Sequence, residues 1–301
     1  MRFKLILSLF FILLISLSLF FYLAPFKISN FIMGDRNSNF SLVESSPEMQ
    51  FYPNLRFPSN EISFKISDCT LQKEDDMGEA FNFISNLTTL KFNSVSSNEE
   101  ISVLCEEKNR YDNGFFIAGE GGPVNITVAG DFNVITKGEI LLIRHSNCPT
   151  PNIAIHELLH VLGFKHSLNK DNILYNITEC DQTLSEDIIG LIDKLYSFPN
   201  YADLIIKNVS GKIDGRFLDI NFSLINGGFK TAGASKVLIY SDDRIIDEIE
   251  IPSIEIGYGR SVYSENIWVS EINTEKLVLK IETNFNELDK ENNFIELYLV
   301  K

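Results

Sequence analysis

Histidine, cysteine and methionine are scarce in this sequence, with four of each among 301 residues, and there is a single tryptophan. Basic residues are also few: 26 lysines and arginines stand against 41 aspartates and glutamates, a formal net charge of −15. A chain this acidic lacks the electrostatic footprint for DNA or RNA, so no nucleic-acid partner is expected. Hydrophobic residues make up 45% and charged residues 22%, proportions that exclude wholesale disorder. The length suits about two domains.

One long hydrophobic run lies at the N-terminus, from Leu5 to Leu23, directly after Arg2 and Lys4. It can cross a hydrocarbon core of about 30 Å as a helix that rises about 1.5 Å per residue. We therefore predict a transmembrane signal anchor over residues 1–24. We favour an anchor over a cleaved signal peptide because no clear small-x-small cleavage site follows. Either alternative keeps the basic end inside, so the expected location is the cell membrane with the folded part outside, or secretion after cleavage.

The four cysteines, Cys69, Cys105, Cys148 and Cys180, all follow this segment. Their position agrees with export, since disulfides persist outside the cytosol. Four cysteines allow three pairings. We prefer Cys69 with Cys105 and Cys148 with Cys180.

Composition and periodicity divide the exported part into three. Residues 25–55 are rich in Ser, Asn and Pro, and we predict a stalk or linker. Residues 56–200 mix strand-like runs with helical spacing, which predicts an α+β domain. Residues 201–301 hold seven short β-like runs and no helical pattern, which predicts a β-sandwich. We expect Trp268 in the core of that sandwich.

Local signals within the α+β domain predict its turns and helix starts. The glycine-rich Gly119–Pro123 segment is predicted as a loop, and Lys137–Gly138 as a tight hairpin turn. One helix is expected to begin at Thr150–Pro151, with Thr150 as its cap, and another at Ser185.

Three of the four histidines, His156, His160 and His166, lie within eleven residues. On a helix, positions i and i+4 share a face, so the first two can bind one ion. Gly163 suits a left-handed turn that would end the helix and bring the third histidine round. Three neutral imidazoles leave a position open for water, the arrangement of a catalytic zinc site, and Glu157 could act on that water as general base. Incidental histidines are the alternative, but this helix is largely apolar, and uncompensated buried imidazoles would be costly.

This motif, with Ser167 directly after the third histidine, resembles the zinc motif of metzincin metalloproteases, and of the matrixins in particular. Downstream, Asp171–Tyr175 resembles the Met-turn that underlies the zinc ligands in that family. Leu174 replaces the methionine, and because leucine has similar volume and apolarity, we expect the floor of the site to survive. The segment Leu184–Tyr196 resembles the last helix of matrixin catalytic domains.

The resemblance covers about residues 50–200 and implies a zincin-like α+β fold: a twisted, mostly parallel sheet, one antiparallel edge strand and an active-site helix. It implies one Zn²⁺ held by the three histidines and peptide-bond hydrolysis with Glu157 as general base. A polypeptide substrate would pair with the edge strand, which we place at Val124–Ile135. A Cys148–Cys180 bridge would tie the active-site helix to the loop after the Met-turn. No second zinc is expected, because only His145 is left over.

Residues 201–301 resemble a CARDB-type module, an immunoglobulin-like sandwich found on exported prokaryotic proteins. The matching segments are Asp203–Ile206, Leu224–Gly228 and Asn286–Asn293. The resemblance implies binding to a cell-surface polymer or protein. The acidic, Asn-rich turn could bind calcium, but the sequence gives no support beyond composition, and we interpret it as a solvated turn before the last strand.

The sequence therefore predicts a membrane-anchored, extracytoplasmic zinc endopeptidase. One alternative is a catalytically silent adhesion protein that zinc stabilises. Glu157 argues against it, since a structural zinc needs no general base. Another alternative is a maturation factor that cuts only its own stalk.

Overall fold

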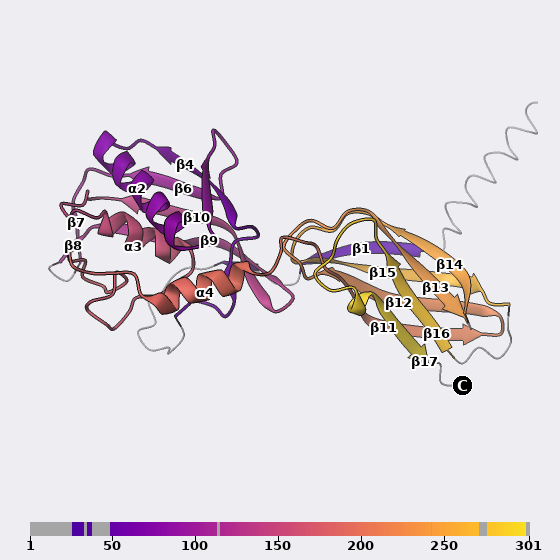
Figure 1. Cartoon of the computed structure of the whole chain (residues 1–301). Coiled ribbons are helices and arrows are strands. Elements are labelled where there is room, and N and C mark those ends of the chain that lie inside the picture. The colour runs from indigo at the N-terminus through magenta and orange to yellow at the C-terminus, as the bar shows by residue number, and fades with distance from the viewer. Residues whose placement is uncertain are drawn as a thin grey trace, which may run out of the picture.

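The computed structural model describes residues 26–32, 35–37, 49–112, 115–241, 243–270 and 276–298, which form an α+β domain and a β-sandwich (Figure 1). The apolar run predicted as a membrane anchor lies outside these residues. Among the residues described, no helix combines the length and the apolarity needed to span a membrane.

The α+β domain is built on a mixed sheet that has seven strands in the described part of the chain. In spatial order they are β2 (Asp35–Asn37), β9 (Gly119–Ala129), β10 (Phe132–Leu142), β6 (Ile101–Cys105), β4 (Glu61–Ser67) and β5 (Lys91–Ser94), with β3 (Leu55–Arg56) beside β10. Strands β10, β6, β4, β5 and β3 are parallel, whereas β9 and β2 are antiparallel to their neighbours. A separate hairpin consists of β7 (Arg110–Asp112) and β8 (Phe115–Ile117). The mostly parallel sheet with an antiparallel edge is the arrangement expected from the sequence.

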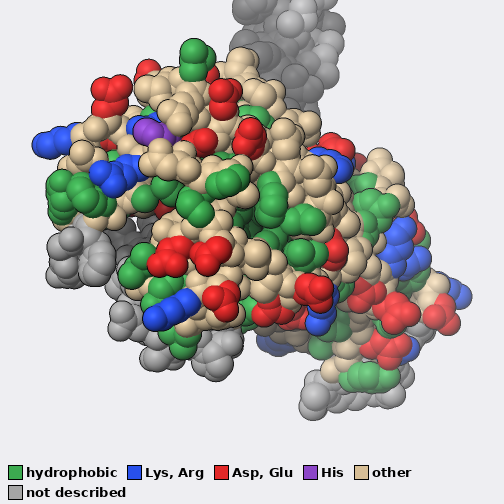
Figure 2. All heavy atoms as spheres, turned by 60° about the vertical axis from the view of Figure 1, so that its left-hand side comes forward, with side chains coloured by type: hydrophobic (Ala, Val, Ile, Leu, Met, Phe, Trp, Pro, Cys, Tyr) green, Lys and Arg blue, Asp and Glu red, His purple; other side chains and the backbone are tan. Residues whose placement is uncertain are grey.

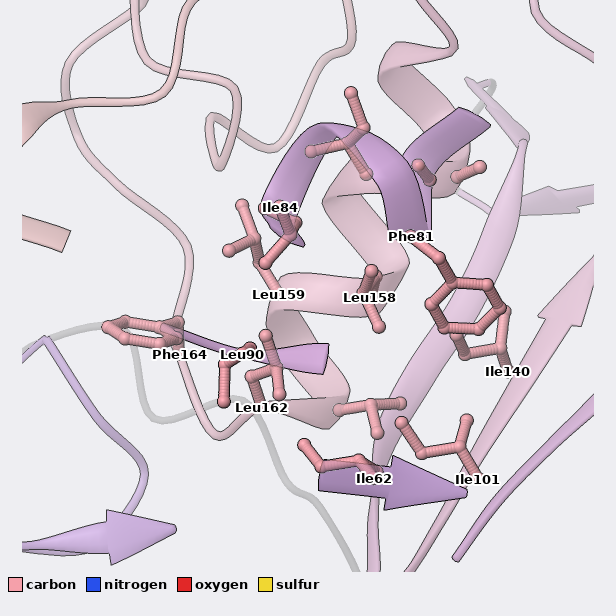
Figure 3. Packing of buried hydrophobic residues seen from close by; sticks show 14 of the residues in the cluster. Ile62, Phe81, Ile84, Leu90, Ile101, Ile140, Leu158, Leu159, Leu162 and Phe164 are labelled. Atoms are coloured by element: carbon pink, nitrogen blue, oxygen red, sulfur yellow. The ribbon is translucent and has the colours of Figure 1, made fainter. Parts of the chain in front are cut away.

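The helices of this domain in the described residues are α2 (Leu71–Leu87), α3 (Asn152–Val161) and α4 (Glu186–Tyr196), the last beginning after Ser185 as expected. Nearly every residue of α3 is buried, because the helix packs against α2 on one side and against β9 and β10 on the other. In Figure 3, Leu158 of α3 lies near Phe81 of α2 and near isoleucines of the sheet, such as Ile101. This packing holds α3 against the sheet.

Three local expectations are wrong. The glycine-rich Gly119–Pro123 segment is not a loop but the first half of β9, and Lys137–Gly138 is not a hairpin turn but an irregularity within β10. The hairpin turns instead at Gly130, whose φ of 57° suits glycine. A Cβ on Gly138 would lie 2.5 Å from Val161 Cγ1, so that glycine makes room for α3. Thr150 does not cap α3 either, since Pro151 takes the capping position without a side-chain hydrogen bond.

The residues beyond α4, together with residues 26–32, form two facing four-stranded sheets. One contains β1 (Phe26–Ile32), β15 (Tyr258–Trp268), β12 (Phe217–Asn226) and β11 (Leu204–Asp214); the other contains β14 (Arg244–Ile251), β13 (Ser235–Ser241), β16 (Lys276–Glu282) and β17 (Phe294–Tyr298), with the short 3₁₀ helix η1 (Glu291–Asn293) before it. Alternate residues of β12, such as Leu218 and Phe222, are buried between the sheets, as their spacing predicts. Trp268 is not in this core: it ends β15, is 55% exposed, and contacts Phe217 edge-on.

The segment predicted as a stalk contains two strands of the folded body. The seven residues of β1 pair antiparallel with β15 in the sandwich, whereas Asp35–Asn37 pair with Asn125–Thr127 of β9 in the first domain. The expectation of a linker is therefore wrong for these residues. Short strands that add to existing sheet edges bring main-chain hydrogen bonds without needing a long periodic pattern.

The two domains meet around the buried guanidinium of Arg56. It donates hydrogen bonds to the carbonyl oxygens of Leu195 and Phe198, and it lies over the rings of Tyr196 and Phe229, the latter from the sandwich. Burial lowers the pKa of Arg56 to about 10, so the group still carries its charge at neutral pH. Carbonyl oxygens and aromatic faces together hold this cation at the junction.

Candidate metal and catalytic site

Helix α3 brings two of the three clustered histidines onto one face. His156 and His160 are four residues apart, and their Nε2 atoms lie 2.9 Å from each other. Both rings are buried, at 5% and 6% exposure, because α3 packs between α2 and the sheet. The i, i+4 geometry predicted from the sequence is therefore present.

The turn after α3 positions the third histidine. Gly163 adopts a φ of 100°, in the left-handed region that favours glycine. Its carbonyl oxygen accepts a hydrogen bond from Phe51 N, and Lys165 N donates to Met49 O, so the chain before β3 pairs with the chain after the helix. This pairing directs His166 back, with its Nε2 3.2 Å from His156 Nε2. The ligand atoms of the three histidines all lie within 4.8 Å of one another.

Backbone carbonyls orient the two helical histidines. His156 Nδ1 lies 2.7 Å from Ile173 O, and His160 Nδ1 lies 2.7 Å from Phe164 O. A carbonyl oxygen can only accept, so each Nδ1 carries the proton and each Nε2 presents a lone pair. Burial lowers the pKa of His156 to about 4 and that of His160 well below its usual value, which keeps both rings neutral as metal ligands must be.

The residues present fit a zinc ion. Neutral imidazoles whose Nε2 lone pairs face one another repel unless a cation lies among them. Nitrogen donors of a tetrahedral zinc stand about 3.3 Å apart, given bonds of about 2.0–2.1 Å, close to the separations of 2.9 Å and 3.2 Å in this cluster. Three nitrogen donors from His156, His160 and His166 leave one position for another ligand, which is typical of catalytic rather than structural zinc.

Glu157 is buried between α3 and the first half of β9. A Cβ on Gly121 would lie 2.4 Å from the Glu157 carbonyl oxygen, and one on Gly119 would lie 2.7 Å from its Cγ. Only glycine at these two strand positions permits β9 to run this close to the carboxyl group. Burial raises the pKa of Glu157 to about 8, and the carboxylate of Glu120 adds to the shift. A dication nearby would favour the ionised form instead.

The segment that stands in the place of a Met-turn packs beneath the cluster. Leu174 is 2% exposed; its carbonyl oxygen accepts from Ser167 N, directly after the third histidine. Asn172 fixes this turn, because its Oδ1 accepts from Leu174 N and its Nδ2 donates to Ser185 Oγ at the start of α4. The apolar floor and the orientation of His156, through Ile173 O, thus come from one turn.

Both preferred disulfides are present, Cys69–Cys105 and Cys148–Cys180. The second joins the chain before α3 to the loop after Leu174, and Asn152 Nδ2 donates to Glu179 O beside it. The loop is therefore tied to the start of the active-site helix.

The structure brings the three histidines together, with Glu157 directly after His156 in α3 and Leu174 hydrogen-bonded to Ser167, and it leaves His145 exposed, outside the cluster. The edge strand was placed at Val124–Ile135, but among the described strands β2 is outermost and covers only Asn125–Thr127 of β9; β10, from Phe132, lies inside the sheet. Sequence reasoning missed the carbonyls of Ile173 and Phe164, which no residue type reveals. It also missed Gly119 and Gly121, whose clustering was the one available signal.

Comparison with known proteins shows which family the first domain matches. Residues 56–197 match the family model of matrixin, peptidase family M10, so the resemblance expected from the zinc motif is confirmed for this part of the chain. No curated protein matches. Among solved structures, myroilysin is 12% identical, over 47% of this chain and 82% of that one, with a TM-score of 0.32. A CARDB domain from Pyrococcus furiosus is 14% identical, over 33% of this chain and 90% of that one, with a TM-score of 0.28. OgpA from Akkermansia muciniphila is 9% identical, over 85% of this chain and 96% of that one, with a TM-score of 0.22.

Proposed function

From the premise that residues 56–197 form a matrixin-like domain, we propose that this chain is a zinc endopeptidase of the metzincin type. The observation that carries the proposal is the convergence of three imidazole ligand atoms, with the buried carboxyl group of Glu157 directly after His156 on the same helix. A structural zinc site needs no such carboxyl. The alternative of a silent, zinc-stabilised adhesion protein leaves Glu157 unexplained.

Zinc, when bound by His156, His160 and His166, supplies a Lewis acid that polarises the scissile carbonyl and makes water more acidic. Glu157 takes up the proton of the attacking water and returns it to the leaving amine. The carbonyls of Ile173 and Phe164 keep two of the imidazoles in the tautomer that this task requires.

The first half of β9 is the proposed substrate-binding edge. Among the described residues, β2 pairs only with Asn125–Thr127, and no strand lies along the outer edge of residues 119–122, beside Glu157. An extended polypeptide that pairs there would gain main-chain hydrogen bonds without much sequence preference. Because β2 already pairs with Asn125–Thr127 of β9, the remaining edge has room for only a short stretch of substrate.

We propose that the enzyme works outside the cell, held at the membrane by the apolar run that ends at Leu23, or secreted if that run is removed. Two disulfides support an oxidising compartment. The sandwich would then bind a surface polymer or a protein and hold the peptidase near its substrates. The acidic face in Figure 2 disfavours polyanionic partners.

The test is cleavage of a broad peptide library by the purified chain and its Glu157→Gln variant, with zinc measured in each. We expect cleavage by the wild type, at least about 100-fold less by Glu157→Gln, and one zinc in both. His145→Gln is the matched control, since it removes the exposed histidine and should change neither readout. Equal cleavage by both proteins, or none while zinc is bound, would contradict the proposal. A mass change of the chain alone, without peptide cleavage, would indicate self-processing.

A further inference from the structure

The strands of the sandwich run between the junction with the first domain and the opposite end, which we call the distal end (Figure 1). At the junction, a Cβ on Gly257 would lie 2.4 Å from Thr127 Oγ1, so the chain just before β15 touches β9. Strand β15 starts beside that contact at Tyr258 and finishes at Trp268, which pairs with Phe217, the first residue of β12. Trp268 and Phe217 therefore lie at the distal end.

This pair forms an exposed aromatic surface at the end of the first sheet of the sandwich. Trp268 is 55% exposed and Phe217 is 45% exposed. The guanidinium of Arg216, in the turn between β11 and β12, lies 5.5 Å from the centre of the Trp268 ring. Two aromatic rings and a cation thus face solvent where the two strands meet.

The second sheet exposes apolar side chains at the same end. Ile254, just beyond β14, accepts a hydrogen bond from Asn226 Nδ2 at the junction end of β12, so β14 begins at the distal end. Ile245, near the start of β14, is exposed there. Tyr298, which pairs with Lys276 at the start of β16, is also exposed. Both sheets therefore present large apolar side chains at the distal end.

The distal end is also where the chain arrives from the apolar run. That run ends at Leu23, and β1 begins three residues later at Phe26, so the two lie within about 11 Å of each other even along an extended chain. Phe26 pairs with Ser264, and β15 continues for four residues beyond Ser264 to Trp268. Those four residues cover about 13 Å. Trp268 therefore extends beyond Phe26 by as much as the link to the apolar run allows.

We propose that the distal end of the sandwich lies on the lipid bilayer, with Trp268 and Phe217 in the headgroup region. The inference rests on the proposed membrane anchor and goes beyond it, because an anchor alone leaves the sandwich at any angle to the bilayer. Tryptophan and tyrosine favour this interface, since their rings are apolar and their polar atoms stay hydrated. Arg216 can place its guanidinium among the lipid phosphates while its apolar stem stays beside the rings.

Charges of both signs occur at the distal end, so neither a polyanion nor a polycation matches it. Strand ends and turns there carry Arg216, Arg244 and Lys276 together with Asp214, Asp219 and Asp243. Phosphocholine headgroups likewise carry both signs. Contact with such a bilayer depends on buried apolar surface, so it should persist in high salt.

This orientation determines where the proposed peptidase would act. The ten residues of β12 run the length of the sandwich, about 30 Å. The first domain joins the sandwich at the junction, at the other end of these strands. The histidine cluster would therefore stand at least about 30 Å from the lipid surface, where it would reach extended surface proteins rather than bonds next to the membrane.

The test uses the only tryptophan of the chain as a reporter. The full chain is reconstituted into phosphatidylcholine nanodiscs, either unmodified or with bromine on the acyl carbons nearest the headgroup, because bromine quenches indole emission on contact. We expect the brominated lipid to lower the emission of Trp268 and to do so equally in high salt. The measurement needs no substitution, so it does not depend on a variant that folds.

The matched control moves the reporter to the junction end of the same strand, through Trp268→Phe combined with Tyr258→Trp. Its emission should be equal in the two lipids. If that protein fails to fold, Leu71→Trp in the same Trp268→Phe background serves instead, at a position of α2 that is 80% exposed in the first domain.

Equal emission of Trp268 in both lipids, while the chain stays in the discs, would overturn the orientation and leave the anchor standing. Equal quenching at both ends of β15 would overturn it too, since the sandwich would then lie flat on the bilayer. A chain that elutes apart from the discs would contradict the anchor and the inference together. None of these measurements involves peptide cleavage, so the result is independent of the proposed peptidase activity.

Discussion

A methyl group at Gly119 should disable Glu157, the proposed catalytic carboxylate, while leaving the proposed zinc site intact. The Cβ of alanine there would lie 2.7 Å from Glu157 Cγ, 2.9 Å from Oε1 and 3.0 Å from Cδ. Carbon atoms in contact normally stand about 3.5–4.0 Å apart, so the Glu157 side chain has to move by about 1 Å. The three atoms nearest to the added methyl group all belong to Glu157.

The magnitude follows from which atoms are displaced. Because the obstructed atoms belong to a side chain that can rotate, the free energy of unfolding should fall by only about 1 kcal/mol, the low end for overpacking. Activity should fall far more, since a misplacement of about 1 Å at a reacting group can cost about 100-fold. The loss in Gly119→Ala should not exceed that in Glu157→Gln, which removes the base altogether.

Three measurements on Gly119→Ala check this: kcat/KM on a cleaved peptide, bound zinc, and the melting temperature. Gly78→Ala in α2 is the matched control, because a Cβ there meets nothing within 4 Å. It should keep full activity and gain up to about 1 kcal/mol from the better helix propensity of alanine. Full activity in Gly119→Ala would refute the reasoning, and so would a parallel loss of zinc.

Three further outcomes are expected. Gly163→Ala should lower the free energy of unfolding, measured in urea titrations, by about 2 kcal/mol. The backbone φ of 100° strains any L side chain, and the added Cβ would lie 2.7 Å from Leu55 Cδ2. An unchanged urea midpoint would contradict this prediction. Leu174→Met should change the free energy of unfolding by less than about 1.5 kcal/mol and kcat/KM by only a few-fold, because the side-chain volume is conserved. Loss of bound zinc in this variant would show that Leu174 does more than fill the apolar floor of the site. Burial raises the pKa of Glu287, with Asp203 adding to the shift and Asn293, Thr283 and Lys290 opposing it. Stability from a raised carboxyl pKa is fully present below its unfolded value of about 4 and is lost as the pH rises through the folded value. The melting temperature of the wild type should therefore fall relative to that of Glu287→Gln as the pH rises above about 4; parallel profiles would argue against a buried carboxylate.

The grouping of the three histidines was predictable because its geometry is local. His156 and His160 share a face through helical spacing alone, and Gly163 marks the reversal that brings in His166. The same holds for the start of α4 after Ser185 and for the alternation of Leu218 and Phe222, since each depends on residues close in sequence.

What the sequence could not reveal depends on contacts between distant segments. Gly119 and Gly121 read as a loop because glycine disfavours strands, yet they form one where a helix passes too close for a side chain. The carbonyls of Ile173 and Phe164 orient two imidazoles through backbone alone, which carries no residue signature. Burial of Glu287 and Asn293, in the turn that the sequence predicts as solvated, follows from the fold of the loop over Asp203, not from composition.

The pairing of Phe26–Ile32 with β15 means that the polypeptide passes between the two halves of the molecule twice, once from β1 to β2 and again from α4 to β11. Two domains that are joined by two segments of chain have fewer rotational degrees of freedom relative to each other than domains joined by one. Cleavage of the chain between Tyr196 and Leu204 would therefore not separate the two domains, because the segment from β1 to β2 still connects them. For the proposed peptidase, the two connections restrict how far the metal site can move relative to anything bound by the sandwich, so geometry as well as chemistry would select which bonds are cut.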